Sequence, residues 1–277
     1  MNSPGYAELH CVSNFTFLRG ASHPGELVYQ ACNLGYSALA LTDECSMAGV
    51  VRALEAAEEC GLKLIIGAEF RCPNDFHVVL LAPSQRAYAQ ICQLITRGRI
   101  HSTKGTYDLS RGHFEEGLNE CLALWVAPRN ARPSEARWLR EFFPGRGWIA
   151  VEMLRQSDDA QHLASMRQLG ESFGLPLVAC GDVHMHVESR RALQDTMTAI
   201  RHGCTMNQAG HRLFPNAERH LRPRQALAEL YPPELLQETL RIAERCQFSL
   251  RSLQYNYPNE IVPAGLTATR HLRDLTE

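Results

Sequence analysis

Short apolar runs alternate with longer segments of helical periodicity along this chain, and that alternation constrains the fold more than any other feature. Runs of this length, bounded by Gly, Pro or charged residues, predict buried strands, and the segments between them carry helix signals such as Pro24 at a start and Gly61 at a stop. Strands that are each followed by a helix predict a parallel sheet covered on both faces. The predicted strands span residues 6–12, 37–42, 62–67, 77–82, 121–126, 148–151 and 175–181.

The number of strand–helix units favours a closed α/β barrel over an open sheet. A doubly wound sheet remains the alternative, although no G-x-G-x-x-G follows the first strand. After His202 the alternation stops, which predicts a barrel over residues 1–203 and a helical extension with a linker over residues 204–277. Within the extension we expect an irregular arm at 203–224, a helical pair at 223–248, a strand-like segment at 253–257, a linker at 258–265 and a helix from 268.

Composition narrows the class of protein. With 277 residues, 45% hydrophobic and 21% charged, the chain resembles a soluble globular protein, and no apolar run reaches the length of a membrane span. The amino terminus lacks a signal-peptide pattern, so we expect a cytoplasmic protein. Ten scattered cysteines without a C-x-x-C pair predict reduced thiols.

Charge gives little evidence for nucleic-acid binding over the chain as a whole, because the net charge is −2. One stretch is locally rich in arginine, and it predicts either a phosphate or acidic-partner patch or a solvated face. Its arginines are Arg190, Arg191, Arg201, Arg212, Arg219, Arg222 and Arg224.

Candidate metal ligands stand at the ends of the predicted strands. Asp182 and His184 follow the last apolar run, and on an extended chain residues i and i+2 point to the same side. Carboxylates and imidazoles at the mouth of an α/β barrel suit a divalent metal. Each of them could equally be an ion-pair partner, a helix cap or a packed histidine, and we expect His162 and His186 at the surface. The candidates are Asp43, Glu44, Glu69, Glu152, Asp182 and His184, with His10 inside the first strand and His77 at the start of the fourth.

Several segments resemble the motifs of PHP (polymerase and histidinol phosphatase) domains, in order along nearly the whole chain. They read LHCVSNFTFLRGA at 9–21, ALTDE at 40–44, IGAEF at 66–70, HVVLLA at 77–82 and GDVH at 181–184. In particular, the chain resembles the N-terminal domain of bacterial C-family DNA polymerases of the polymerase III alpha type. The segments at 13–24, 42–46 and 213–216 resemble the error-prone branch that acts in damage-induced mutagenesis.

The resemblance implies a distorted (β/α)7 barrel, a three-metal cleft in active members, and a polymerase that continues beyond Glu277. The parent enzyme would be a DNA-directed DNA polymerase whose palm carboxylates hold Mg²⁺, outside this chain. The positions that match metal ligands are His10, Glu69, His77, Asp182 and His184, with Glu44 as a further candidate.

Two departures from the family pattern weaken the expected site. Val12 stands where the family has a second histidine, and Arg19 stands where polymerase relatives carry an acidic ligand. An isopropyl group cannot bind a metal, and a fixed cation repels one. Arg19 could instead pair with Glu44, Glu69 or Asp182. We therefore expect one or two weakly bound divalent metals, Zn or Mn, or none.

The sequence thus predicts a structural and interaction domain of an error-prone polymerase that acts in translesion synthesis. Its expected partners are the polymerase core of the same protein and DNA, with accessory mutagenesis proteins and the sliding clamp as further candidates, and no membrane. This chain alone should not extend a primer. The alternatives are an active metal-dependent phosphoesterase or proofreading exonuclease, and a metal-dependent deaminase or amidohydrolase. The short first-strand motif and the lack of a strand-end lysine weigh against the last.

Overall fold

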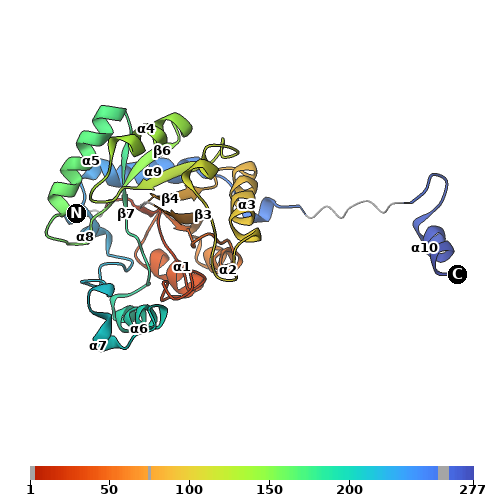
Figure 1. The fold of residues 1–277 in the computed structure, drawn as a ribbon, viewed down its shortest axis with the longest axis horizontal. Helices are drawn as coiled ribbons and strands as arrows, with labels where there is room; N and C mark the ends of the chain where they lie inside the picture. Colours follow the sequence, from red (N-terminus) through yellow and green to blue (C-terminus); the bar gives the residue numbers. More distant parts are fainter. Residues whose placement is uncertain (1–3, 74–75, 255–261) are drawn as a thin grey trace.

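Seven strands form one sheet that curls into a nearly closed barrel (Figure 1). The computed structural model describes residues 4–73, 76–254 and 262–277. The strands follow chain order across the sheet, and a parallel bridge between Cys11 and Val183 joins its two edges. The predicted (β/α)7 architecture is confirmed. The strands are β1 Ala7–Glu8, β2 Ala38–Leu41, β3 Lys63–Cys72, β4 Phe76–Leu81, β5 Leu122–Val126, β6 Gly147–Glu152 and β7 Leu177–Cys180.

The barrel is distorted at β4, which runs antiparallel to both β3 and β5. The expectation of a wholly parallel sheet was therefore wrong at this strand. β3 is longer than its apolar run, so only residues 73–75 separate it from β4. A crossover between parallel strands needs about a dozen residues, and so short a connection leaves only the antiparallel arrangement.

β1 is also much shorter than the predicted strand at 6–12. The buried carboxylate of Glu8 accepts hydrogen bonds from the backbone N–H groups of Leu9 and His10, at 3.1 and 3.0 Å. The N–H of Cys11 donates instead to the hydroxyl of Thr42. Because these donors are used locally, the ladder with β2 ends at Glu8 although the chain continues toward the barrel mouth.

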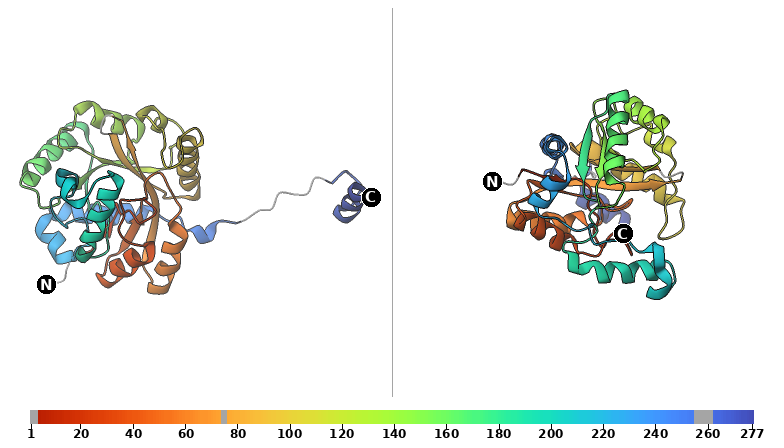
Figure 2. Two further views of the ribbon diagram at one scale, coloured as in Figure 1. Left: turned by 60° about the horizontal axis from the view of Figure 1, so that its bottom comes forward. Right: turned by 90° about the vertical axis from the view of Figure 1, so that its left-hand side faces the viewer.

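The helices between residues 24 and 173 cover the outside of the barrel (Figure 2). Their ends follow the expected signals, since Ser84 caps α3 and Gly61 and Gly174 end α2 and α5 in the left-handed conformation. The α-helices are α1 Pro24–Asn33, α2 Val50–Cys60, α3 Gln85–Ile100, α4 Pro133–Phe142, α5 Asp159–Phe173, α6 Arg191–Arg201, α7 Met206–Ala209, α8 Arg224–Leu230, α9 Pro233–Arg245 and α10 Ala268–Thr276. The 3₁₀ helices are η1 Arg111–Phe114, η2 Glu188–Arg190, η3 Gly210–Arg212 and η4 Leu250–Ser252.

Two apolar cores hold the barrel together. One lies between the sheet and the surrounding helices, and the other fills the barrel interior. α9 contributes Ile242 and Ala243 to the interior core, and the hydroxyl of Thr239 accepts a hydrogen bond from the N–H of Ala7 at 3.1 Å. α9 therefore belongs to the barrel core, while the division into residues 1–203 and 204–277 stays a proposal.

The remaining expectations concern the carboxyl-terminal part and the chain as a whole. The helical pair split at Pro232 and the helix from residue 268 are present. Of the strand-like segment at 253–257, residues 253 and 254 are in no strand and the rest lies outside the described residues, as do residues 258–261 of the linker. In the ranges that are described, no helix is long and apolar enough to cross a membrane, and all ten cysteines are free thiols.

Candidate metal cleft

The centre of the cleft at the barrel mouth is His10, which lies between two carboxylates. Its Nε2 is 2.7 Å from Oε2 of Glu69 at the mouth end of β3, and its Nδ1 is 2.7 Å from Oε1 of Glu152 at the end of β6. His77 on β4 approaches the same Glu69 oxygen at 3.1 Å. Burial opposes the charged imidazole, but the two carboxylates outweigh it and raise the pKa of His10 to about 10. His10 is thus a cation at neutral pH.

Two groups of side chains could each hold a metal ion, with ligand atoms within 4.8 Å of one another. The first consists of His10, Glu69 and His77, and the second of His10, Glu152 and Asp182. Both groups share His10. The sequence had identified Glu152 only as a strand-end candidate, outside the set of positions matched to the family's ligands.

Asp182 and His184 are in contact, but not for the reason that the sequence suggested. β7 ends at Cys180, and Asp182 has a left-handed φ of 44°, so the pair lies on a turn rather than on an extended strand. Oδ1 of Asp182 is 2.9 Å from Nε2 of His184, and Gln194 of α6 lies 2.8 Å from Nδ1. Burial lowers the pKa of His184 to about 4. Both ring nitrogens are therefore engaged, and His184 joins neither ligand group.

Arg19 occupies the side of the cleft next to Glu69. Its guanidinium donates to Glu44 and to Glu69, as expected from the sequence, and only 10% of its side chain is exposed. Burial favours a neutral Glu69, but Arg19, Arg71 and His10 more than offset it and hold the pKa of this carboxyl well below its usual range. The Arg19 cation thus supplies charge that a metal would otherwise supply.

Asp43 holds the loop that carries Arg19. Asp43 is buried and belongs to neither group of candidate metal ligands. Its carboxylate accepts the N–H and hydroxyl of Ser13 at 2.7 and 2.8 Å, and the hydroxyl of Thr16 at 2.7 Å. Gly20 closes the loop, because a Cβ there would lie 1.9 Å from the carbonyl oxygen of Ser13. Val12, just before the loop, is fully buried. Asp43 therefore fixes the position of Arg19.

A second arginine, Arg219, binds the opposite side of the cleft. Its Nε donates to Oδ2 of Asp182 at 2.7 Å, and its guanidinium lies 3.8 Å from the centre of the Phe214 ring. Burial raises the pKa of Asp182, but Arg219 and His184 outweigh it and hold the pKa well below its usual range. The arginine-rich stretch is therefore divided among several contacts, since Arg190 pairs with Glu26 and Arg222 is buried.

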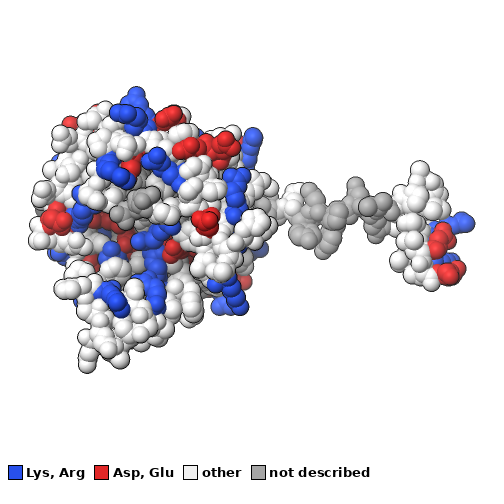
Figure 3. Space-filling view, viewed as in Figure 1, with Lys and Arg blue, Asp and Glu red and all other residues white. Residues whose placement is uncertain are grey.

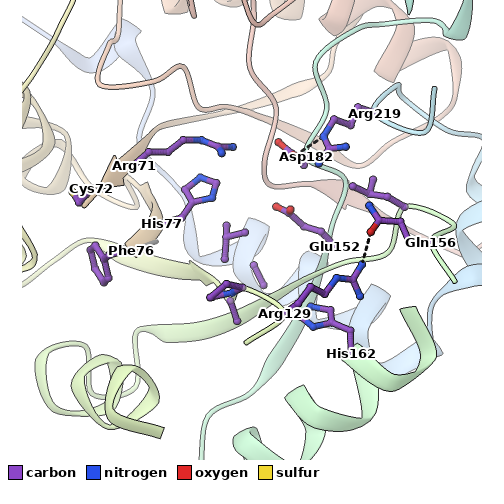
Figure 4. A pocket seen from close by; sticks show the side chains of 15 residues that line it. Arg71, Cys72, Phe76, His77, Arg129, Glu152, Gln156, His162, Asp182 and Arg219 are labelled. Atoms are coloured by element: carbon purple, nitrogen blue, oxygen red, sulfur yellow. Dashed lines mark hydrogen bonds and ion pairs between the residues drawn. The ribbon is translucent and has the colours of Figure 1, made fainter. Parts of the chain in front are cut away.

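A pocket of about 370 Å³ opens beside these residues (Figure 4). His162 of α5 lines this pocket and is only 6% exposed. The expectation that His162 lies at the surface was therefore wrong, because the first turn of α5 faces the pocket. On the face shown in Figure 3, basic side chains gather near the centre of the barrel, interspersed with acidic ones. The charged and imidazole residues of the lining are Arg71, His77, Arg129, Glu152, His162, Asp182 and Arg219.

Comparison with known families identifies the fold. The PHP domain model matches residues 8–163, more than half of the chain. The chain belongs to the PHP domain family. It is 55% identical over 273 residues to an error-prone DNA polymerase of Methylococcus capsulatus, covering 98% of this chain and 26% of that protein. It is 52% identical over 282 residues to one of Dechloromonas aromatica, covering 100% and 28%.

Among solved structures, this PHP domain resembles a protein of Bifidobacterium adolescentis described as a candidate metal-dependent phosphoesterase. The TM-score is 0.51 at 15% identity, covering 66% of this chain and 88% of that one. At that identity the likeness supports the fold alone. The chain spans about a quarter of the length of the polymerases it matches.

The donor set fits the family's metal cleft only in part. The PHP family and the two ligand groups suggest metal binding. However, Val12 offers no donor, Arg19 already bonds two carboxylates, and both groups share the single imidazole of His10. Each cation raises the cost of bringing a divalent ion into the cleft. The residues therefore do not fit a three-metal cluster.

Proposed function

We propose that this chain is the N-terminal PHP domain of an error-prone DNA polymerase and that it acts as a structural and interaction module. The observation that carries the proposal is the guanidinium of Arg19 bonded to Glu44 and Glu69 inside the cleft. Buried carboxylates that a divalent cluster would use are neutralised by the protein's own cations. Removing one partner of such a network would leave a buried charge less compensated, and the bonded carboxylates leave no open three-metal cluster for turnover.

The proposal for the parent protein rests on its relatives, which are named error-prone DNA polymerase. We infer that the parent adds nucleotides with Mg²⁺ held by palm carboxylates outside this chain, in the cytoplasm, during damage-induced mutagenesis and translesion synthesis. Residues 204–277 would lead toward that core. DNA, accessory mutagenesis proteins and the sliding clamp are its proposed partners.

We further propose that the cleft binds one or two divalent ions weakly, Zn or Mn, or none. The ligands would come from His10, Glu69, His77, Glu152 and Asp182. An ion bound there would polarise a phosphoryl oxygen or a bound water. The second group, in which His10 contacts only one oxygen of Glu152, supports one rival function, a metal-dependent phosphoesterase or proofreading exonuclease.

A hydrolysis assay separates the two functions. The isolated chain, supplied with Mn²⁺ or Zn²⁺, is expected to release no phosphate from a phosphate monoester and no nucleotides from single-stranded DNA. Metal-dependent turnover that Glu152→Ala abolishes, and that the exposed-site control Arg86→Ala retains, would establish the rival function instead.

A second assay tests the structural role in the parent protein. The isolated chain should extend no primer. The parent polymerase carrying Arg19→Met should unfold at a lower temperature and lose primer extension in parallel. Full extension with unchanged thermal stability would contradict a supporting role for the Arg19 network.

A further inference from the structure

Two cysteines lie next to each other on the outside of the barrel, away from the metal cleft. Cys32 is in the last turn of α1, and Cys60 is the last residue of α2. The two helices pack side by side (Figure 1). Each helix is followed shortly by a strand, β2 or β3, and these strands are parallel and run toward the mouth. Both cysteines therefore lie at the end of the barrel opposite to the cleft.

Small side chains bring the two helices close together. Ala56 and Ala57 are the buried residues in the last two turns of α2. A Cβ on Gly25 of α1 would lie 3.8 Å from the Cβ of Ala56. Nearer the cysteines, the hydroxyl of Tyr29 donates to the carboxylate of Glu59 and ties the two helices at the surface. The two backbones are thus held at a separation that short side chains can bridge.

The thiols of Cys32 and Cys60 are in contact in the reduced protein. Sγ of Cys32 donates across the helix interface to the carbonyl oxygen of Cys60 at 3.2 Å. Sγ of Cys60 lies 3.9 Å from the carbonyl oxygen of Ala57 in its own helix. A hydrogen bond between the two thiols raises the pKa of Cys32. A disulfide requires two sulfurs that can meet at bonding distance, and this pair already has its sulfurs together.

Both sulfurs can be reached from the solvent. Cys32 and Cys60 are half-buried, whereas Cys11 and Cys180 are fully buried. Next to Cys60, Gly61 faces open space, since no atom of the described residues lies within 4 Å of the position that a Cβ would take. A small oxidant can therefore approach the pair, and thiols with such access are the ones that react.

We propose that Cys32 and Cys60 form a reversible disulfide by exchange with a low-molecular-weight disulfide of the glutathione type. The thiolate of one cysteine attacks the glutathione disulfide, which gives a mixed disulfide and releases one glutathione thiolate. The thiolate of the other cysteine then attacks the protein sulfur of that mixed disulfide, forms the Cys32–Cys60 bond and releases the second glutathione. The two thiol protons pass to the two glutathione thiolates, so the protein loses two electrons and the oxidant gains them.

The disulfide would join α1 to α2 covalently. Cys32 and Cys60 are 28 positions apart, and a cross-link over such a loop stabilises a domain mainly by restricting the unfolded chain. In a reducing compartment, disulfides are usually transient and sense the redox state. The pair therefore makes the stability of the barrel depend on the thiol–disulfide balance, whether or not the cleft holds a metal.

Titration of the whole chain with mixtures of reduced and oxidised glutathione tests this disulfide. It is run at about pH 8, where more of the Cys32 thiol is ionised than at neutral pH. Mass spectrometry of peptides prepared without reductant should find the Cys32 and Cys60 peptides joined, and dithiothreitol should separate them. The thermal midpoint of the oxidised chain should lie roughly 5–10 °C above that of the reduced chain.

Single-cysteine variants distinguish this pair from the other thiols. Cys32→Ser and Cys60→Ser should each carry glutathione as a mixed disulfide on the remaining cysteine and show no rise in midpoint. Cys92→Ser, at a half-buried thiol of α3, should form the cross-link and gain stability like the unaltered chain. Mixed disulfides at both cysteines without a cross-link, a cross-link to another cysteine instead, or a joined pair with an unchanged midpoint would overturn the proposal.

Discussion

The carboxylates on the two sides of the cleft differ in burial and in the number of charged partners. On one side, Glu69 is fully buried and contacts Arg19, Arg71, His10 and His77. On the other, Glu152 is 14% exposed and shares only one oxygen with His10, so it remains open to the pocket. The Glu69 side is closed by internal ion pairs, and the Glu152 side is still accessible. A residual metal or a ligand should therefore depend on the second side.

The largest expected effect comes from removing the cation on the closed side. Arg19→Met leaves Glu44 and Glu69 without their shared partner. We expect a cost of about 1–3 kcal/mol, because Arg71, His10 and His77 still contact Glu69. Urea denaturation near neutral pH measures it. Arg86→Met, at an exposed arginine, should stay within about 0.5 kcal/mol of the unaltered chain. Equal values for the two variants would show that the closed side contributes no stability.

The next largest effect concerns the affinity for a residual metal on each side of the cleft. Glu152→Gln should weaken Zn²⁺ binding more than tenfold, because it removes the accessible carboxylate of the second group. His77→Gln should change it less than about threefold, because Glu69 beside it is already neutralised by Arg19. Competition with a chromogenic chelator gives both constants. The reverse order would place the ion on the Glu69 side.

A smaller effect is expected at the loop that positions Arg19. Thr16→Val keeps the shape of the side chain but removes the hydrogen bond to Asp43, at a cost of about 1–2 kcal/mol. Phe17→Ser, one residue away and 81% exposed, should change stability by less than about 0.5 kcal/mol. Thermal unfolding of the two variants compares them. A larger loss from Phe17 would mean that the loop is not held by Asp43.

The sequence predicted the barrel because strand–helix alternation is a local property of the chain. The same pattern could not give strand direction, since the antiparallel β4 follows from the connection at residues 73–75 and not from hydrophobicity. It also placed candidate ligands at strand ends, and the structure brings His10, Glu69, His77, Glu152 and Asp182 into one cleft.

Long-range partners were beyond the reach of sequence patterns. Arg219 lies 37 residues from Asp182, and only its membership of an arginine-rich stretch had singled it out. The sequence predicted His162 at the surface, but it is 6% exposed. Helical periodicity alone does not show which other segments pack against the first turn of a helix. The pairing of Arg19 with Glu44 and Glu69 could be predicted because a buried cation near strand-end carboxylates has few other partners.

Elemental analysis of the purified chain tests the central claim most directly. After chelation and dialysis against Zn²⁺ or Mn²⁺, the chain should retain at most one or two weakly held ions, lost again on a second chelation. The paired variant Val12→His with Arg19→Asp, which restores two donors and removes the cation, should retain more metal than the unaltered chain. Three tightly bound ions in the unaltered chain would contradict the replacement of metal by arginine.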